Sequence, residues 1–468
     1  MNLNNYKEAI CSSELVKRTG KVVQFFGLIV ESMGPDAFLG ELCEIHSPTA
    51  SNPILAEVVG LKNGCVLLMP YGDLRGISLG SEVAATGRSV DVSVGDSLLG
   101  RVIDSFGKPL DEGPEINVEN RYPLYSDPIN PLQREKISDC LETGVRSIDS
   151  LLTVGKGQRI GIFAGSGVGK STLLGMIARN MKADVNVIAL IGERGREVKD
   201  FIEESLGEEG LAKSVVIAAT ADQPALVRTH AAFVASAIAE YFRDQGKHVV
   251  LTMDSVTRFA TAQREIGLAI GEPPTSRGYT PSVFTVMPRL LERGGRIKGG
   301  GSITAFYTVL VDGDDMNDPI ADNVRSILDG HIVLSRDLAN SGHFPAVDIL
   351  QSVSRLMPDL ASDKELKSAN DTVAYINTYD KAKDMVELGA YRSGTNPELD
   401  AAIGLMPEIE TFLKQDRFEK SNRDEGMFKL NKILSAANSN LTQAKPQGQM
   451  QAKTGAVNKM MQDLNMGK

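Results

Sequence analysis

The sequence predicts an α/β protein in which a central sheet domain lies between a small N-terminal β-barrel and a C-terminal helical domain. Three observations predict this fold class. Short β-rich runs fill residues 21–95, apolar β runs alternate with helical stretches from about 132 to 357, and only helical patterns follow Met357. The alternation is typical of a largely parallel sheet covered by helices. A chain of 468 residues also exceeds one ordinary domain.

The first 95 residues divide into a helical and a β-rich segment. Residues 1–20 place Ile10, Leu15 and Val16 among charged side chains, which predicts an amphipathic helix that either docks on a partner or frays as a terminus. Many short strands at close spacing, punctuated by Gly, Pro and Asn, predict a small barrel or sandwich over 21–95. The runs are Lys21–Val30, Leu39–Ile45, Ile54–Leu61, Cys65–Met69, Glu82–Thr86 and Val90–Val94.

The central domain is predicted over residues 96–357. It opens with a proline-rich stretch from Pro114 to Pro131 that is typical of a connection. The buried strands of its sheet are predicted at Ile160–Phe163, Val185–Ile191, Ser214–Ala218, Val249–Met253, Ser302–Val309 and Gly330–Leu334.

The C-terminal part is predicted to be a small helical domain over 358–435. Its clearest helical patterns are Asp363–Gly389 and Asn396–Gln415. From about Ala436 the chain is rich in Asn, Gln, Lys and Met with few aliphatic anchors, so 436–468 is expected to be a disordered tail.

Composition excludes several classes of protein. The formal net charge of −10 argues against a nucleic-acid coat, because phosphate binding needs clustered Lys and Arg. The four cysteines form no C-x-x-C pair and have no His cluster nearby, so reduced thiols of a cytosolic protein are expected and a zinc site is not. The N-terminus lacks the pattern of a secretory signal, and no apolar run approaches the ~20 residues that cross a bilayer. A cytoplasmic protein is therefore expected.

The strongest local signal is a phosphate-binding loop. It reads Ala164-Gly165-Ser166-Gly167-Val168-Gly169-Lys170-Ser171, follows an apolar strand and precedes a helical run from Thr172. Glycines let backbone N–H groups turn inward around an anion, and the helix N-terminus adds its positive dipole end. Lys170 is expected to reach the β- and γ-phosphates and Ser171 to ligate Mg²⁺. Ala164 replaces the first glycine of the motif, which is tolerable where φ is negative.

Two acids follow apolar strands and complete a hydrolytic site. Asp254 ends the strand that begins at Val249 and is expected to hold Mg²⁺ at the carboxyl end of the sheet. Glu193 follows the strand that ends at Ile191 and is a candidate for polarising the attacking water. The alternative for Glu193 is a solvated ion pair with Arg194 or Arg196.

Together, the segment Gly192–Glu197, the phosphate loop and the strand ending at Asp254 resemble the catalytic subunits of F1-type rotary ATPases and their type III secretion relatives. The likeness runs from about residue 20 to 420 and implies a RecA-like core. Four segments resemble the flagellar branch, although virulence-secretion ATPases share much of them: Ala262–Gly267, Gly271–Pro274, Gly278–Phe284 and Thr143–Arg146.

The resemblance also implies roles for single residues. Glu193, with Arg194 beside it, matches the catalytic glutamate, and Phe344 matches the aromatic position that stacks on adenine. Arg355 matches the arginine finger that reaches into a neighbouring subunit's site. A core aromatic and a surface ion-pair arginine are the alternatives for Phe344 and Arg355. A chain that carries both Glu193 and Arg355 can form a ring with identical copies, so a homohexamer is expected.

The implied activity is Mg-dependent ATP hydrolysis that drives flagellar protein export. The resemblance implies an export regulator at the N-terminal helix, a stalk protein in the ring, chaperone–cargo complexes at the C-terminal face, and a peripheral place at the inner-membrane export gate. The segment Gly267–Thr280 is a candidate inner loop of the ring. The alternatives are a virulence secretion ATPase, a proton-coupled rotary ATPase subunit, a non-enzymatic ring subunit, which Glu193 argues against, and a hexameric RNA translocase. The translocase is disfavoured because residues 21–95 carry few, unclustered basic residues.

Overall fold

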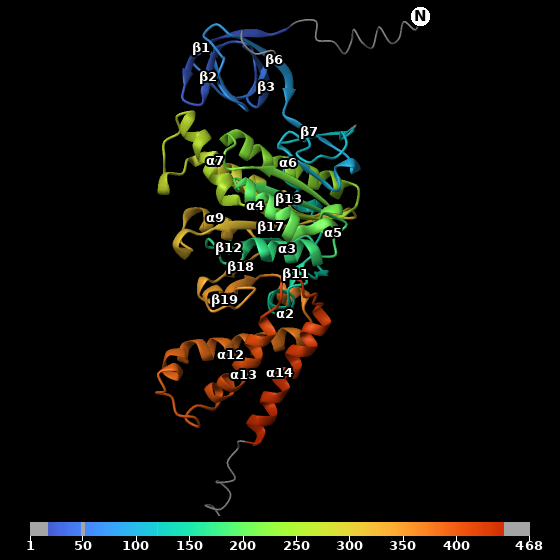
Figure 1. Ribbon diagram of the computed structural model, residues 1–468, viewed down its shortest axis with the longest axis vertical. Coiled ribbons are helices and arrows are strands. Elements are labelled where there is room, and N and C mark those ends of the chain that lie inside the picture. The colour runs from blue at the N-terminus through green and yellow to red at the C-terminus, as the bar shows by residue number, and fades with distance from the viewer. Residues whose placement is uncertain (1–16, 48–51, 119, 444–468) are drawn as a thin grey trace, which may run out of the picture.

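The computed structural model describes residues 17–47, 52–118 and 120–443. The barrel, the central sheet domain and the helical domain follow one another along the longest axis of the molecule (Figure 1). This arrangement confirms the predicted fold class. Within the described residues, no helix is both long enough and apolar enough to span a bilayer.

The N-terminal domain is a closed six-stranded barrel with strand order β1-β2-β5-β4-β3-β6. Alternating burial along β3 sends Cys43 and Ile45 into the barrel core, as a half-buried strand requires. The strands are β1 (Thr19–Phe26), β2 (Ile29–Met33), β3 (Glu41–His46), β4 (Ile54–Lys62), β5 (Cys65–Pro70) and β6 (Glu82–Ser89).

The barrel differs from its predicted limits at both ends. Strand β1 begins at Thr19, inside the predicted helix 1–20, while residues 1–16 lie outside the described residues. The run Val90–Val94 is not a barrel strand, because β7 (Asp91–Val94) pairs with β9 (Asn120–Pro123) in a separate two-stranded sheet. The side chains of Val92 and Val94 pack into the core of the central domain instead.

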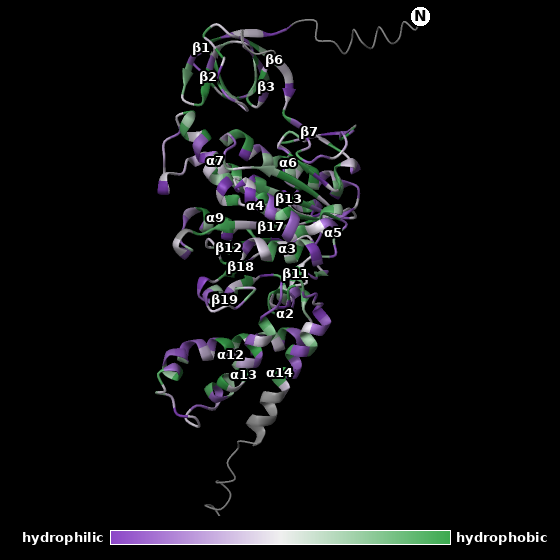
Figure 2. Ribbon diagram, viewed as in Figure 1, coloured by the Kyte–Doolittle hydropathy of each residue, from purple (hydrophilic) through white to green (hydrophobic). Residues whose placement is uncertain are grey.

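The central sheet has strand order β19-β18-β12-β17-β15-β13-β14-β8, with short β16 paired to β17. All neighbours on this path are parallel except β18 and β19. Its strands read as continuous apolar runs because helices cover both faces (Figure 2). The strands are β8 (Arg101–Ile103), β12 (Arg159–Ala164), β13 (Val185–Ile191), β14 (Ser214–Ala219), β15 (His248–Asp254), β16 (Gly295–Arg296), β17 (Ser302–Leu310), β18 (Gly330–Leu334) and β19 (Val347–Ser354); β10 (Cys140–Leu141) and β11 (Val154–Gly155) form a separate pair.

Most helices of this domain lie in the crossovers between parallel strands. Helix α6 is buried along most of its length and packs against β13, β14 and β15. The α-helices are α2 (Arg146–Leu151), α3 (Lys170–Asn180), α4 (Gly195–Asp200), α5 (Gly207–Ala212), α6 (Ala225–Asp244), α7 (Val256–Ala269), α8 (Pro281–Leu291), α9 (Pro319–Ile327), α10 (Arg336–Asn340) and α11 (Met357–Leu360).

The C-terminal domain consists of α12 (Asp363–Glu387), α13 (Pro397–Leu413) and α14 (Arg423–Gln443). Ser362 forms a capping box with Glu365 at the start of α12, which fixes that boundary. Helix α14 continues past Ala436, because its sequence remains free of Gly and Pro there, so the predicted tail begins too early. Residues 444–468 lie outside the described residues.

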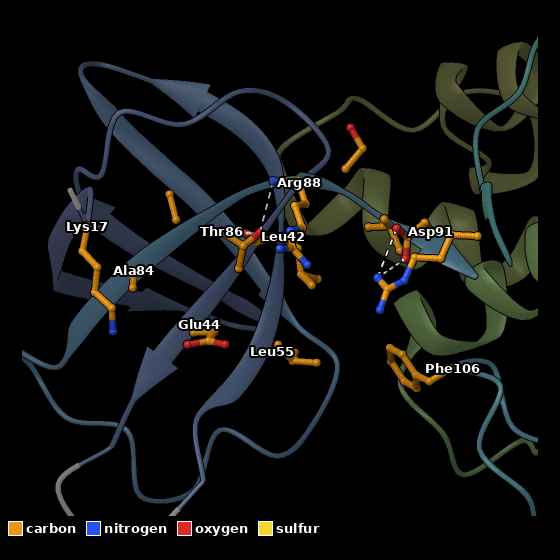
Figure 3. A pocket seen from close by; sticks show the side chains of 13 residues that line it. Lys17, Leu42, Glu44, Leu55, Ala84, Thr86, Arg88, Asp91 and Phe106 are labelled. Carbon is orange, nitrogen blue, oxygen red and sulfur yellow. Dashed lines mark hydrogen bonds and ion pairs between the residues drawn. The ribbon is translucent and has the colours of Figure 1, made fainter. Parts of the chain in front are cut away.

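The barrel joins the central domain through a buried carboxyl group. The hydroxyl of Tyr71 donates to Glu57 at 2.6 Å, and that of Tyr125 donates at 3.2 Å. Burial raises the pKa of Glu57 above its usual range, against the lowering effect of the two hydroxyls. Beside this junction lies a cleft of about 410 Å³ between the barrel and the central domain, with the Arg121–Asp91 ion pair on its wall (Figure 3). The domains are therefore joined by polar as well as apolar contacts.

Candidate nucleotide-binding site

The phosphate loop lies between β12 and α3, in the strand–loop–helix context that was expected. Ala164 is the last residue of β12 and is buried, so this position does not need the freedom of a glycine. Gly167 and Gly169 have φ values of 79° and 92°, in the left-handed region that glycine favours. A Cβ on Gly167 would meet nothing within 4 Å, so the loop is open on that side. Such a loop presents its backbone N–H groups to an anion.

Lys170, at the start of α3, contacts both predicted acids. Its Nζ lies 2.5 Å from Asp254 Oδ1 and 3.4 Å from Glu193 Oε1. All three side chains are largely buried, with exposed fractions of 11%, 4% and 14% for Lys170, Asp254 and Glu193. The residues come from the carboxyl ends of β12, β15 and β13, where open α/β sheets bind ligands. The structure therefore brings together the three groups that sequence spacing could only suggest.

The charges in this cluster shift its pKa values. Burial lowers the pKa of Lys170, but the carboxylates of Asp254 and Glu193 outweigh this and raise it above its ordinary value. Burial raises the pKa of Glu193 to about 7, opposed by Lys170 and reinforced by Asp254 and Glu197. The hydrogen bond from Glu193 lowers the pKa of Glu197. The interaction between these two glutamates therefore favours the protonated form of Glu193 over that of Glu197.

Three contributors to the site were not predicted. Thr308 Oγ1 donates to Asp254 Oδ1 at 2.7 Å from the neighbouring strand β17. Glu197 lies in the first turn of α4 and raises the pKa of Glu193. The side chain of Arg258 crosses Gly192, where a Cβ would lie 3.0 Å from it. A polar residue near the carboxyl end of a predicted strand was the available signal for Thr308, whereas Arg258 depends on the packing of α7.

The remaining loop residues fit a magnesium–nucleotide complex. Ser171 and Thr172 are exposed in the first turn of α3, and Val168 is buried beneath the loop. Gly165 lies under the Asp314–Arg336 ion pair, since a Cβ there would come within 2.6 Å of Asp314 Oδ1.

Among the described residues, no group of three His, Cys, Asp or Glu side chains could hold a metal by itself. The Ser171 hydroxyl and the Asp254 carboxylate are instead the kind of donors that suit Mg²⁺, which keeps several waters and binds through one or two protein groups plus phosphate oxygens.

Phe344 lies beside the phosphate loop. A Cβ on Gly169 would be 3.5 Å from two carbons of its ring. The ring is 46% exposed, so it is not the core aromatic of the alternative interpretation. An exposed aromatic face next to a phosphate loop is suited to stacking on a base.

Arg355 does not join the site of its own chain. It follows β19, and the pairing of Ser354 with Gly330 puts it at the amino end of β18, whereas Lys170 lies beyond the carboxyl ends. Its side chain is exposed and, within the part of the chain that the structure describes, has one long hydrogen bond, 3.4 Å to the Arg325 carbonyl. The side chain of Arg194 is exposed and pairs with Glu197 at 3.4 Å.

The fold and this site define a P-loop nucleotide-binding protein with the acids needed for hydrolysis. The family model "ATP synthase alpha/beta family, nucleotide-binding domain" matches residues 144–354, and the beta-barrel domain model of the same family matches 22–87. The model "T3SS EscN ATPase C-terminal domain" matches 361–432. The chain belongs to the ATP synthase alpha/beta family, in its group of flagellar and type III secretion ATPases.

Individual relatives are similar in sequence to this protein over most of its length. The flagellum-specific ATP synthase of Bacillus subtilis is 54% identical over 436 residues, which is 92% of this chain and 99% of the relative. The type 3 secretion system ATPase of Xanthomonas euvesicatoria is 49% identical, covering 85% of this chain and 90% of the relative. The assembled ATPase EscN of enteropathogenic E. coli, a solved structure, has a TM-score of 0.85 at 45% identity, over 89% of this chain and 100% of EscN.

Proposed function

We propose that this protein hydrolyses ATP with Mg²⁺ as one subunit of a homohexameric ring that energises the export of flagellar type III secretion substrates. The observation that carries the proposal is the contact of Lys170 with Glu193 and Asp254 at the phosphate loop. The flagellum-specific ATP synthases of Bacillus subtilis and Treponema pallidum, at 54% and 53% identity, support the flagellar assignment. The Xanthomonas secretion ATPase, at 49%, is as similar as the flagellar relative of Salmonella typhimurium, so the virulence branch stays the alternative.

The residues divide the work of hydrolysis between them. The N–H groups of Gly165 to Thr172 bind the phosphates, and the Lys170 ammonium neutralises the charge that develops on the transferred phosphoryl group. Ser171 and Asp254 would hold Mg²⁺, which would supply positive charge against the phosphate oxygens. Glu193 orients the attacking water once it has lost its proton.

Two arginines and one aromatic complete the proposal. Phe344 stacks on the adenine ring. Arg355 enters the site of the next subunit and stabilises transition-state charge, which its place far from Lys170 of the same chain supports. Arg194 stays at the rim of the site, on Glu197.

The ring is expected to act on a membrane-bound machine without itself crossing the membrane. EscN has been solved both assembled and with its central stalk EscO, which supports a ring and a stalk partner for this chain. An export regulator, chaperone–cargo complexes and a cytoplasmic site at the inner-membrane export gate belong to the same proposal.

The proposal is tested by ATP hydrolysis measured against protein concentration, with Mg²⁺, for the wild type and Glu193→Gln. We expect specific activity to rise with concentration, because each site needs Arg355 from a neighbour, and to fall about 10²–10⁴-fold in the variant. Activity independent of concentration contradicts the shared site. Activity retained in the variant contradicts the role of Glu193.

A further inference from the structure

Gln415 is a buried amide at the point where the helical domain meets the nucleotide site. It follows directly after α13 and its C-cap Lys414, and its exposed fraction is 6%. The side-chain oxygen accepts a hydrogen bond from Arg146 N at 2.8 Å. The side-chain nitrogen donates to the carbonyls of Gly144 and Glu419 at 2.8 and 2.9 Å. The amide is therefore held in one orientation, because a flip would set donor against donor and acceptor against acceptor.

The backbone of Gln415 holds the loop that carries Phe344. Its N–H donates to the Phe344 carbonyl at 2.9 Å. The ring of the same residue lies next to Gly169 of the phosphate loop and is 46% exposed. One residue thus links the start of α2, the helical domain and the aromatic ring beside the phosphate loop.

Arg146 makes this link rigid. Its guanidinium donates to the carbonyls of Phe412 and Lys414 at 3.0 and 3.2 Å, and pairs with Glu419. The turn 412–419 is therefore bonded to the central domain on both sides of Gln415. This network helps to set the position of the Phe344 backbone beside the phosphate loop. The other backbone contacts there are His343 N to the Leu338 carbonyl and Ser335 N to the Ala346 carbonyl, both at 2.9 Å.

We propose that Gln415 is a positioning residue for the nucleotide base, acting through Phe344. This inference rests on the proposed function, in which Phe344 stacks on adenine. Gln415 itself touches no phosphate-binding residue among its hydrogen-bond partners. Its loss should therefore weaken the binding of ligands that carry a base and spare ligands that consist of phosphate alone.

The test compares ADP and tripolyphosphate as competitive inhibitors of the assembled wild type and of Gln415→Glu. The carboxylate would face the Gly144 and Glu419 carbonyls and break the network. We expect the inhibition constant of ADP to rise about tenfold and that of tripolyphosphate to change less than about twofold. Gln415→Met keeps the side-chain volume without the charge and gives the same selective loss if the glutamate variant does not fold.

The matched control is Asn186→Asp, which makes the same chemical change at another buried amide. Asn186 donates to the Ala178 carbonyl at 3.1 Å, near the far end of α3 from the phosphate loop. It should lower the melting temperature without changing the ratio of the two inhibition constants. Equal weakening of ADP and tripolyphosphate by the Gln415 variants, or no change for ADP, overturns the inference.

Phe344→Ala, measured in parallel, separates this inference from the function on which it rests. If Phe344→Ala leaves the ratio of the two inhibition constants unchanged, the base contact of the proposed function is wrong. If Phe344→Ala changes the ratio and the Gln415 variants do not, only the positioning role is wrong.

Discussion

The two ends of the central sheet hold their functional charges in different ways. At the carboxyl end, Lys170 is largely buried and contacts two acids of its own chain, at 2.5 and 3.4 Å. At the amino end of the sheet edge, Arg355 is exposed and donates one 3.4 Å hydrogen bond to a carbonyl. A buried, paired cation acts in the site in which it lies. An exposed arginine with a weak contact can bind another molecule instead, because little free energy is lost when that contact breaks.

The largest expected effect is that of Arg355, and it tests the contrast between this exposed arginine and the buried Lys170. Arg355→Ala should lower ATPase activity by about 10³-fold or more in the assembled protein, because an arginine finger stabilises transition-state charge. Melting temperature should hardly change, since the side chain is exposed. Arg325→Ala, which removes a neighbouring arginine paired with Asp322, is the matched control. A loss below about tenfold for Arg355→Ala contradicts the finger role.

Mixing two inactive variants tests whether the two ends belong to different sites. Arg355→Ala and Lys170→Ala chains, combined in equal amounts and reassembled, should regain about a quarter of wild-type activity. A random ring places an intact Lys170 beside an intact Arg355 at that fraction of its interfaces. Activity in the mixture that stays at the level of the separate variants would mean that each chain completes its own site.

The buried acids at the carboxyl end of the sheet also predict how kcat/KM depends on pH. Glu193, with a pKa of about 7, must lose its proton to orient water, so kcat/KM should fall about tenfold per pH unit below that value. Glu197→Gln should move this limb to lower pH, because the Glu197 carboxylate raises the pKa of Glu193. The control is Glu203→Gln, three residues beyond the end of α4. Glu203 pairs with Lys199, and this variant should not shift the pH dependence of kcat/KM. A limb that does not move in Glu197→Gln contradicts the effect of Glu197 on the pKa of Glu193.

The smallest effect compares two threonines at opposite ends of β17. Thr308→Val removes the donor to Asp254 and should destabilise the protein by ~1–3 kcal/mol while lowering kcat a few fold. Thr304→Val removes an acceptor for Gly157 N at the amino end and should destabilise it similarly without changing kcat. Chemical denaturation and steady-state kinetics measure both. Equal losses of kcat in Thr308→Val and Thr304→Val would show that the hydrogen bond to Asp254 makes no specific contribution to the reaction.

Local sequence alone determined the main elements and the phosphate loop. Val185–Ile191 and Gly330–Leu334 form strands with the predicted limits, because continuous apolar runs between turn signals are typical of buried parallel strands. The loop from Ala164 to Ser171 was identified because its strand, glycines and helix are contiguous in the chain. The roles of its residues in hydrolysis stay predictions until the kinetics are measured.

Only the tertiary structure decided which distant residues meet. Val90–Val94 has the pattern of a barrel strand, yet it pairs with Asn120–Pro123, because periodicity specifies a strand and not its partner. Gln415 and Gly144 are 271 residues apart and share a hydrogen bond that no local pattern encodes. The contact of Lys170 with Glu193 and Asp254, and the distance of Arg355 from them, follow from the order of strands in the sheet. That order is set by packing of the whole domain, whereas the elements themselves follow from neighbouring side chains.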